Sequence, residues 1–291
     1  MKEIRMKYPK EQPGTEMEDK IKRLYQDEFG GGIVIMDLSV LDRGLSAETL
    51  DRMSVLTAQK AAGSMEKFQQ KLKLLSVCAA DGETGDPAET LDVFDPSYRI
   101  VKKEYADYCR VFCDIDRLLA VEGTKPVLGA IDGKSGSGKS TLGELIREVY
   151  ECSLFHMDDF FLQPHQRTEE RFAEIGGNVD YERFYDQVLI PVLAGKNFSY
   201  RRYDCCSGKL AETIDVTASR LNIIEGVYSQ HPYFGEIYDL KYFLTVSDEE
   251  QKERILKRNG EFMLERFLNE WIPLENAYFE KFGIGKTVIK K

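Results

Sequence analysis

VLGAIDGKSGSGKST, residues 127–141, joins an apolar run to a glycine-rich loop. The apolar run at 127–131 predicts a buried strand, and residues 133–141 fit the pattern G-x-x-x-x-G-K-[ST]. Glycines let the backbone curl so that successive N–H groups point into one cavity, and a helix starting near Gly138 adds the positive end of its dipole. The stretch therefore predicts a site for the phosphates of a nucleoside triphosphate.

Two side chains of this loop have specific expected roles. Lys139 should reach the β- and γ-phosphates, and the hydroxyl of Ser140 should ligate Mg²⁺. We therefore expect ATP and Mg²⁺ as cofactors. The residues expected to contact the nucleotide are Gly133, Ser135, Gly136, Ser137, Gly138, Lys139, Ser140 and Thr141.

Composition limits the class of protein. The chain has 291 residues, of which 42% are hydrophobic, so it can bury a substantial core. A formal net charge of -10 argues against broad binding to nucleic acid or to anionic membranes. The chain begins with no apolar run of signal-peptide length, and no run of about 18 apolar residues occurs. We expect a cytoplasmic protein with a small-molecule partner. The sequence leaves the oligomeric state open, including a homo-oligomer.

The cysteines predict no metal or redox site. The sequence contains 6 of them, and none forms the C-x-x-C spacing of a zinc site or a redox couple. Cys109 and Cys113 lie one helical turn apart, which allows a shared ligand but favours two small core residues. We expect reduced thiols.

Residues 1–120 predict a mainly helical region of unknown role. Candidate helices cover 15–29, 46–76 and 97–120, and Ser46 is the expected N-cap of the second. The region offers no catalytic constellation.

From residue 121 onward, short apolar runs alternate with helical stretches. The expected strands are 127–131, 153–157, 221–224 and 241–246. Such runs suit an α/β fold in which a parallel sheet is flanked by helices, and ligands then bind at the carboxyl ends of the strands. We expect one nucleotide-binding domain over residues 121–291.

Acidic residues follow two of these strands. Asp158 and Asp159 end the second strand, where they can provide a general base for an acceptor hydroxyl and a contact to Mg²⁺. The alternative is an N-cap for the next element. Glu225 ends the third strand, where a carboxylate can hold Mg²⁺ or its waters, although such acids are often turn residues. We expect Ser140, Asp158 and Glu225 to form the metal site.

A basic helix is expected between the capping box at Ser247 and the stop signal Asn259-Gly260. Basic residues at 254, 257 and 258 share one face and can close over transferring phosphates as a lid. The alternative is a set of ordinary helix ion pairs with Glu250 and Glu253. Arg258 is the favoured catalytic arginine, because no acid stands four residues before it.

Polar residues that suit recognition of a polar substrate are concentrated between residues 167 and 204. From this part of the chain and the acidic strand end before it, we expect substrate contacts from Asp159, Arg167, Asp180 and Tyr203.

The order of the motifs resembles the uridine kinase and phosphoribulokinase family over about residues 121–291. The motifs are Gly133 to Thr141, Asp158-Asp159-Phe160-Phe161, Asn178-Val179-Asp180, Tyr203-Asp204, Ile224-Glu225-Gly226 and the basic helix around Arg258. The resemblance implies a kinase that uses ATP to phosphorylate a small-molecule hydroxyl, most directly that of a nucleoside. It also implies that Asp158 is the catalytic aspartate and that Asp180 and Tyr203 lie near the nucleoside.

The sequence departs from the family at two places. The family's nucleoside kinases carry a histidine after Tyr203-Asp204, whereas Cys205-Cys206-Ser207-Gly208 follows here. The family's arginine-rich lid is replaced by Arg258-Asn259-Gly260. Pantothenate-like alcohols, sugar phosphates and glycerate-like acids therefore stay open as acceptors beside nucleosides.

An ATP-dependent switch or scaffold that binds a protein through residues 1–120 is the alternative function. The sequence lacks the N-K-x-D guanine motif, which argues against an ordinary GTPase switch. A switch does not need Asp158 opposite the loop, so the kinase is favoured.

Overall fold

The computed structural model describes residues 32–60, 98–285 and 288–289. The chain divides into two compact units, Met1–Arg117 and Leu118–Lys291. The glycine-rich loop and every predicted site residue belong to the second unit.

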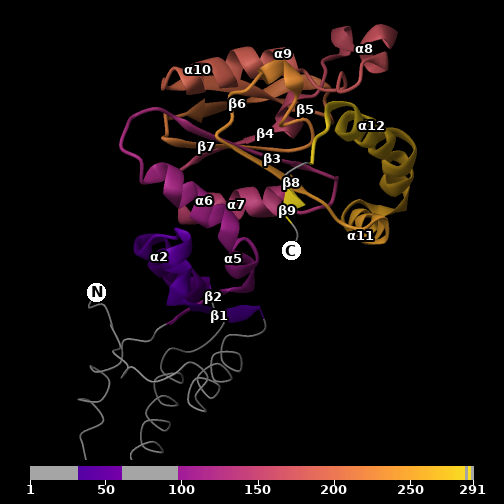
Figure 1. Cartoon of the computed structure of the whole chain (residues 1–291). Helices are drawn as coiled ribbons and strands as arrows, with labels where there is room; N and C mark the ends of the chain where they lie inside the picture. The colour runs from indigo at the N-terminus through magenta and orange to yellow at the C-terminus, as the bar shows by residue number, and fades with distance from the viewer. Residues whose placement is uncertain (1–31, 61–97, 286–287, 290–291) are drawn as a thin grey trace, which may run out of the picture. The chain divides into compact units, whose positions relative to one another are not determined.

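The described part of the first unit combines helices with a pair of antiparallel strands (Figure 1). β1 (Ile33–Asp37) pairs with β2 (Tyr98–Lys102). The helices are η1 (Leu38–Arg43), α2 (Ala47–Lys60), α5 (Lys103–Asp107) and α6 (Cys109–Leu119). Ser46 caps α2 as predicted, because its Oγ accepts a hydrogen bond from Thr49 N at 3.0 Å.

The prediction of a single helix over 97–120 is wrong at its start. Residues 98–102 form β2, whose β-branched Ile100 and Val101 suit a strand, and the helices begin at Lys103. Pairing with β1, far away in the sequence, overrides the helical pattern. The predicted helix at 15–29 and residues 61–76 of the second lie outside the described residues.

The second unit is built on a five-stranded parallel sheet with the order β4-β7-β3-β8-β9. The strands are β3 (Val127–Gly133), β4 (Ser153–His156), β7 (Leu221–Glu225), β8 (Leu240–Leu244) and β9 (Val288–Ile289). The four predicted strands are thus confirmed, with small shifts at their ends. Because neighbouring strands are parallel, the carboxyl ends of β4, β7 and β3 meet at one edge.

Helices cover both faces of this sheet. Figure 1 shows α7 (Lys139–Val149) on one face, and α9 (Tyr181–Phe184) with α10 (Ile190–Leu193) on the other. The main apolar core includes Phe184 and Leu189 from the second face together with sheet residues such as Phe155. The predicted α/β architecture is therefore present.

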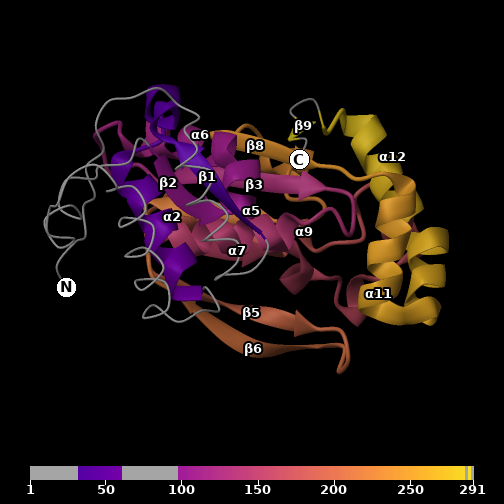
Figure 2. The ribbon, with the colours of Figure 1, turned by 90° about the horizontal axis from the view of Figure 1, so that it is seen from below.

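An antiparallel hairpin is an element that the sequence reasoning missed. β5 (Phe198–Asp204) pairs with β6 (Lys209–Val216), and both lie to one side of the parallel sheet in Figure 2. The connecting turn begins at Asp204, whose carboxylate accepts from the N–H groups of Cys206 and Ser207 at 3.0 and 3.1 Å. The hairpin carries Tyr203, one of the predicted substrate residues.

The predicted basic helix begins where expected. α11 (Asp248–Arg266) starts after Ser247, whose side chain accepts from Glu250 N. The expected stop at Gly260 is a break with φ 79°, after which helical structure resumes. η7 (Phe267–Trp271) and α12 (Ile272–Phe282) follow, and α11 lies beside α12 in Figures 1 and 2.

Short helices complete the second unit. They are η3 (Met157–Phe160), η4 (Pro164–Gln166), α8 (Glu169–Ala173), η5 (Tyr185–Leu189) and η6 (Pro232–Phe234). Across the described parts of both units, no helix combines the length and the apolar character that a membrane crossing requires.

Candidate active site

The phosphate-binding loop connects β3 to α7 and turns at three glycines. Gly133, Gly136 and Gly138 have φ angles of 140°, 76° and 98°, which L side chains rarely adopt. A Cβ atom on Gly133 would lie 2.0 Å from the carbonyl oxygen of Leu244 in β8. Gly138 precedes the first residue of α7, so the first-turn N–H groups of that helix can face an anion.

Lys139 and Ser137 supply buried polar side chains to this loop. The Nζ of Lys139 donates to the carbonyl oxygens of Gly133 and Lys134 at 2.8 and 3.0 Å. Within the described residues, the buried Oγ of Ser137 has no hydrogen-bond partner. A buried ammonium beside helix N–H groups, together with a hydroxyl that needs a partner, fits the phosphate oxygens of a nucleotide.

Ser140 and Glu225 lie together at the strand ends. The Oγ of Ser140, in the first turn of α7, donates to Oε2 of Glu225 at 3.2 Å. The other oxygen, Oε1, lies 2.6 Å from Nδ1 of His156, which pairs with Glu225 in the register of β4 and β7. This hydrogen bond raises the pKa of His156. An oriented hydroxyl and carboxylate are hard oxygen donors that fit Mg²⁺.

No group of three or more His, Cys, Asp or Glu side chains in the described part of the chain could hold a metal ion by itself. Mg²⁺ in phosphate-transferring enzymes commonly uses one or two carboxylates, with substrate phosphates and waters as its other ligands. The Ser140 and Glu225 pair beside the loop matches that mode of binding.

Asp158 lies in η3 and is the second residue after β4. Its side chain is exposed, and among the described residues no hydrogen bond engages its carboxylate. Although solvent reaches Asp158, many protein atoms surround it, and this partial desolvation, followed by the charge of Glu225, raises the pKa of Asp158, whereas Lys139 and His156 lower it. Asp158 is therefore accessible to a ligand and lies within the electrostatic reach of the loop lysine.

Asp159 is buried and is bonded within the protein. Its Oδ2 accepts from the hydroxyl of Tyr200 at 3.0 Å, and its Oδ1 forms an ion pair with Nε of Arg202 at 2.8 Å. Both partners belong to β5. Asp159 thus attaches the hairpin to the end of β4, directly beside Asp158.

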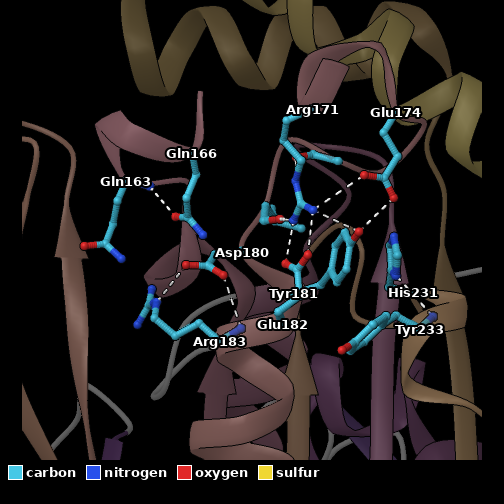
Figure 3. A network of polar contacts seen from close by, with 12 residues as sticks. Gln163, Gln166, Arg171, Glu174, Asp180, Tyr181, Glu182, Arg183, His231 and Tyr233 are labelled. Carbon is cyan, nitrogen blue, oxygen red and sulfur yellow. Dashed lines mark hydrogen bonds and ion pairs between the residues drawn. The ribbon is translucent and has the colours of Figure 1, made fainter. Parts of the chain in front are cut away.

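Asp180 has a comparable structural environment. It is the N-cap of α9, and its oxygens accept from N and Nε of Arg183 at 3.1 and 3.2 Å (Figure 3). The guanidinium of Arg183 also donates to the backbone oxygen of Asp159 at 2.9 Å. The predicted residues Asp159 and Asp180 are therefore connected through Arg183.

A second arginine, Arg171, contacts several neighbouring side chains in Figure 3. Arg171 donates to both carboxylate oxygens of Glu182 at 2.6 Å, and its Cζ lies 4.1 Å from the ring centre of Tyr181. That ring stacks on His231 with centroids 4.2 Å apart. Burial lowers the pKa of His231 to about 4, so this histidine is neutral at physiological pH. The arrangement serves packing.

Tyr203 and Arg167 contact each other. The hydroxyl of buried Tyr203 accepts from Nη2 of exposed Arg167 at 2.7 Å. Cys205, in the hairpin turn, is exposed; partial desolvation of its thiol and the charges of Asp158 and Asp204 raise its pKa, while Arg167 lowers it. The thiol of Cys205 is therefore influenced by the charges of both Asp158 and Arg167.

The arginine of α11 that touches the loop is Arg254. Its Nη1 donates to the carbonyl oxygen of Gly136 at 3.0 Å, and its Nη2 forms the expected ion pair with Glu250. Arg258 is exposed, and its Nε donates to Oδ1 of Asn259 at 2.7 Å. Sequence spacing could not show which arginine contacts the loop, because the ion pair of Arg254 with Glu250 leaves its Nη1 able to donate to Gly136.

The sequence reasoning also missed two residues that hold Ser135 of the loop. Gln251 of α11 donates from Nε2 to the carbonyl oxygen of Ser135 at 3.0 Å. Glu275 of α12 accepts from Ser135 N at 3.0 Å and from its Oγ. Both lie far from the loop in sequence, and no local pattern marks them.

No protein-family model matches the chain, and no curated protein does. Among solved structures it is similar to a possible uridine kinase from Bacillus stearothermophilus, with 22% identity and a TM-score of 0.46 over 60% of this chain and 94% of that one. It is also similar to a candidate fructose transport system kinase from Silicibacter sp. TM1040, with 19% identity and a TM-score of 0.47 over 57% and 91%. These similarities concern the fold.

Proposed function

We propose that the chain is an ATP- and Mg²⁺-dependent kinase that phosphorylates a hydroxyl of a small molecule, with a nucleoside as the favoured acceptor. The observation that carries the proposal is the solvent-accessible Asp158 two residues after His156, which pairs in the sheet with Glu225, the hydrogen-bond partner of Ser140. A loop that only binds nucleotide has no need of an open carboxylate there.

In the proposed reaction, the loop N–H groups and Lys139 bind the phosphates of ATP. Lys139 exchanges the carbonyl oxygens of Gly133 and Lys134 for phosphate oxygens. Ser140 and Glu225 would hold Mg²⁺, which neutralises phosphate charge when it is bound. His156 keeps the Glu225 carboxylate oriented through its 2.6 Å hydrogen bond.

Asp158 positions the acceptor hydroxyl and accepts its proton. A bond forms between the acceptor oxygen and the γ-phosphorus, and the bond between that phosphorus and the β,γ-bridging oxygen breaks, which releases ADP. We propose that Arg167 and Tyr203, which are hydrogen-bonded to each other at 2.7 Å, contact the acceptor. The catalysis rests mainly on positioning and charge stabilisation.

Cys205 stands where the resemblance leads one to expect a base-recognising histidine. The thiol is exposed near Asp158, and it donates a hydrogen bond far more weakly than imidazole does. We therefore propose that a nucleoside, if it is the acceptor, is held more by Arg167 and the hairpin than by a contact from position 205.

An acceptor screen tests the proposed function. Purified chain with ATP and Mg²⁺ is incubated with nucleosides, pantothenate-like alcohols, sugar phosphates or glycerate-like acids, and ADP formation is followed. One class should raise ADP formation at least about tenfold above the rate without acceptor, since a bound hydroxyl replaces water as the nucleophile. ATP binding without stimulation by any class, together with nucleotide-dependent retention of a protein, would instead support the switch.

A further inference from the structure

Helix α12 contacts the phosphate-binding segment at two points. Glu275 accepts from N of Ser135 at 3.0 Å and also from its hydroxyl, and the hydroxyl of Tyr278 donates to Oδ2 of Asp132 at 2.9 Å. Asp132 directly precedes Gly133 at the start of the loop. Since Glu275 and Tyr278 are three residues apart, they lie on one face of the helix. One face of α12 therefore holds both the strand end and the loop.

The Glu275 contact brings a negative charge to an anion-binding loop. The residue is 4% exposed, and its carboxylate accepts from the backbone N–H and the hydroxyl of the same serine. The loop pattern G-x-x-x-x-G-K-[ST] presents backbone N–H groups to phosphate. The Glu275 carboxylate thus accepts hydrogen bonds from two donors, the N–H and the hydroxyl of Ser135, in the loop segment that is expected to bind phosphate.

The charges around Glu275 come from several elements. Burial raises the pKa of Glu275, Lys139 of α7 and the Ser135 hydrogen bonds lower it, and Asp158 of η3 raises it. Tyr228, in the segment after β7, is buried and also feels the charge of Glu275. Glu275 and the nucleotide phosphates would therefore interact with the same ammonium group.

Two anions near one ammonium group in a buried site repel each other, and an added negative charge favours protonation of a nearby carboxyl. ATP brings several negative charges to Lys139, so its binding should weaken the interaction of Lys139 with Glu275. The ionised carboxylate therefore opposes nucleotide binding, whereas a protonated or neutral side chain does not.

We propose that the negative charge of Glu275 competes with nucleotide at the loop. The carboxylate binds Ser135 when no nucleotide is bound and repels the phosphates of ATP when they bind. This inference rests on the proposed binding of ATP by the loop. The chemical class of the competing ligand is a nucleoside polyphosphate. Because Glu275 belongs to α12, the competition takes place at the contact between this helix and the loop.

Glu275→Gln separates charge from shape. The glutamine amide oxygen can accept from Ser135 N, and its NH₂ group can donate to Ser135 Oγ, so both hydrogen bonds have replacements. Glu280→Gln is the matched control, because Glu280 lies on the same helix, is exposed, and loses the same charge away from the loop. Thermal unfolding of the three proteins checks that each is folded.

Calorimetric titration with Mg²⁺ and ATP measures the effect across about pH 5 to 8. At neutral pH, Glu275→Gln should bind ATP about tenfold more tightly than the unaltered protein, and Glu280→Gln should match the unaltered protein. Because the protonated acid binds better, affinity of the unaltered protein should fall as pH rises through the pKa of Glu275. The gap to Glu275→Gln should therefore close toward low pH.

Equal or weaker binding by folded Glu275→Gln overturns the proposal, because the carboxylate would then support the loop. If that variant does not fold, a measurement on the unaltered protein alone tests the proposal. Titrations in two buffers of different ionisation enthalpy should show proton uptake on ATP binding, and no uptake overturns the proposal. Absence of any ATP binding by the unaltered protein overturns the proposed function as well, which distinguishes the two failures.

Discussion

Replacing Asp158 by asparagine is expected to lower acceptor-stimulated turnover about a thousandfold while ATP affinity stays within about threefold. The amide has the size of the carboxylate but cannot accept the hydroxyl proton. Asp158 is exposed and makes no hydrogen bond to the described residues, so its replacement disturbs little of the fold. Steady-state kinetics with the acceptor from the screen and calorimetric titration with ATP measure the two quantities.

Asp215→Asn is the matched control for this variant. Asp215 is exposed in β6, and the change removes the same charge from the surface without touching the strand ends. Its turnover should equal that of the unaltered protein. Unchanged turnover in Asp158→Asn would remove Asp158 from the mechanism, and equal losses in both variants would point to a general charge effect.

Replacing Lys139 by alanine is expected to weaken ATP binding about a hundredfold and to lower turnover further. The variant loses the ammonium group that is expected to contact the phosphates. It also loses the 2.8 and 3.0 Å hydrogen bonds to the carbonyl oxygens of Gly133 and Lys134, which loosens the loop. Equilibrium titration with ATP measures the affinity, and denaturant unfolding measures the change in stability.

Lys209→Ala serves as the control for this change, because Lys209 is an exposed lysine at the start of β6. ATP affinity should not change in this control. If Lys139→Ala bound ATP as tightly as the unaltered protein, the phosphates would have to bind elsewhere, and the assignment of the loop would be lost.

Local sequence patterns, namely apolar runs and a helix-capping box, predicted most of the fold of the second unit. The apolar runs around Ile131, Phe155, Ile223 and Phe243 predicted four strands of the parallel sheet. The reason is clearest for β3 and β7, which are buried along their whole length, whereas β4 and β8 are buried only in part. The capping box at Ser247 located the start of α11 for a similar reason, since the cap depends on residues within one turn.

Elements that depend on distant partners were harder to predict. β2 forms because β1 pairs with it, and the hairpin of β5 and β6 was hidden by the number of charged residues in it. Tyr200 and Tyr203 are buried in that hairpin. In the sequence, the aromatic residues Phe198 and Tyr200 alternate with polar residues, which was a signal that could have revealed β5, although the register shift between Arg201 and Tyr203 interrupts it.

The residues of the candidate site also differ in how well the sequence predicts them. Gly133 and Lys139 belong to a continuous motif, whose residues predict a phosphate site without knowledge of the fold. The contacts of Arg254 and Glu275 with the loop arise from the packing of α11 and α12, which begin far beyond the loop in sequence. Residue type and spacing could not indicate which face of either helix meets the loop.

A crystal structure with a non-hydrolysable ATP analogue, Mg²⁺ and the acceptor tests the central claim most directly. The measurement is the distance from the Asp158 carboxylate to the γ-phosphorus. The proposed transfer predicts at most about 6 Å, because the acceptor oxygen must lie about 3 Å from each group. A carboxylate that points away from the phosphates, or a gap that one hydroxyl group cannot bridge, would contradict the account.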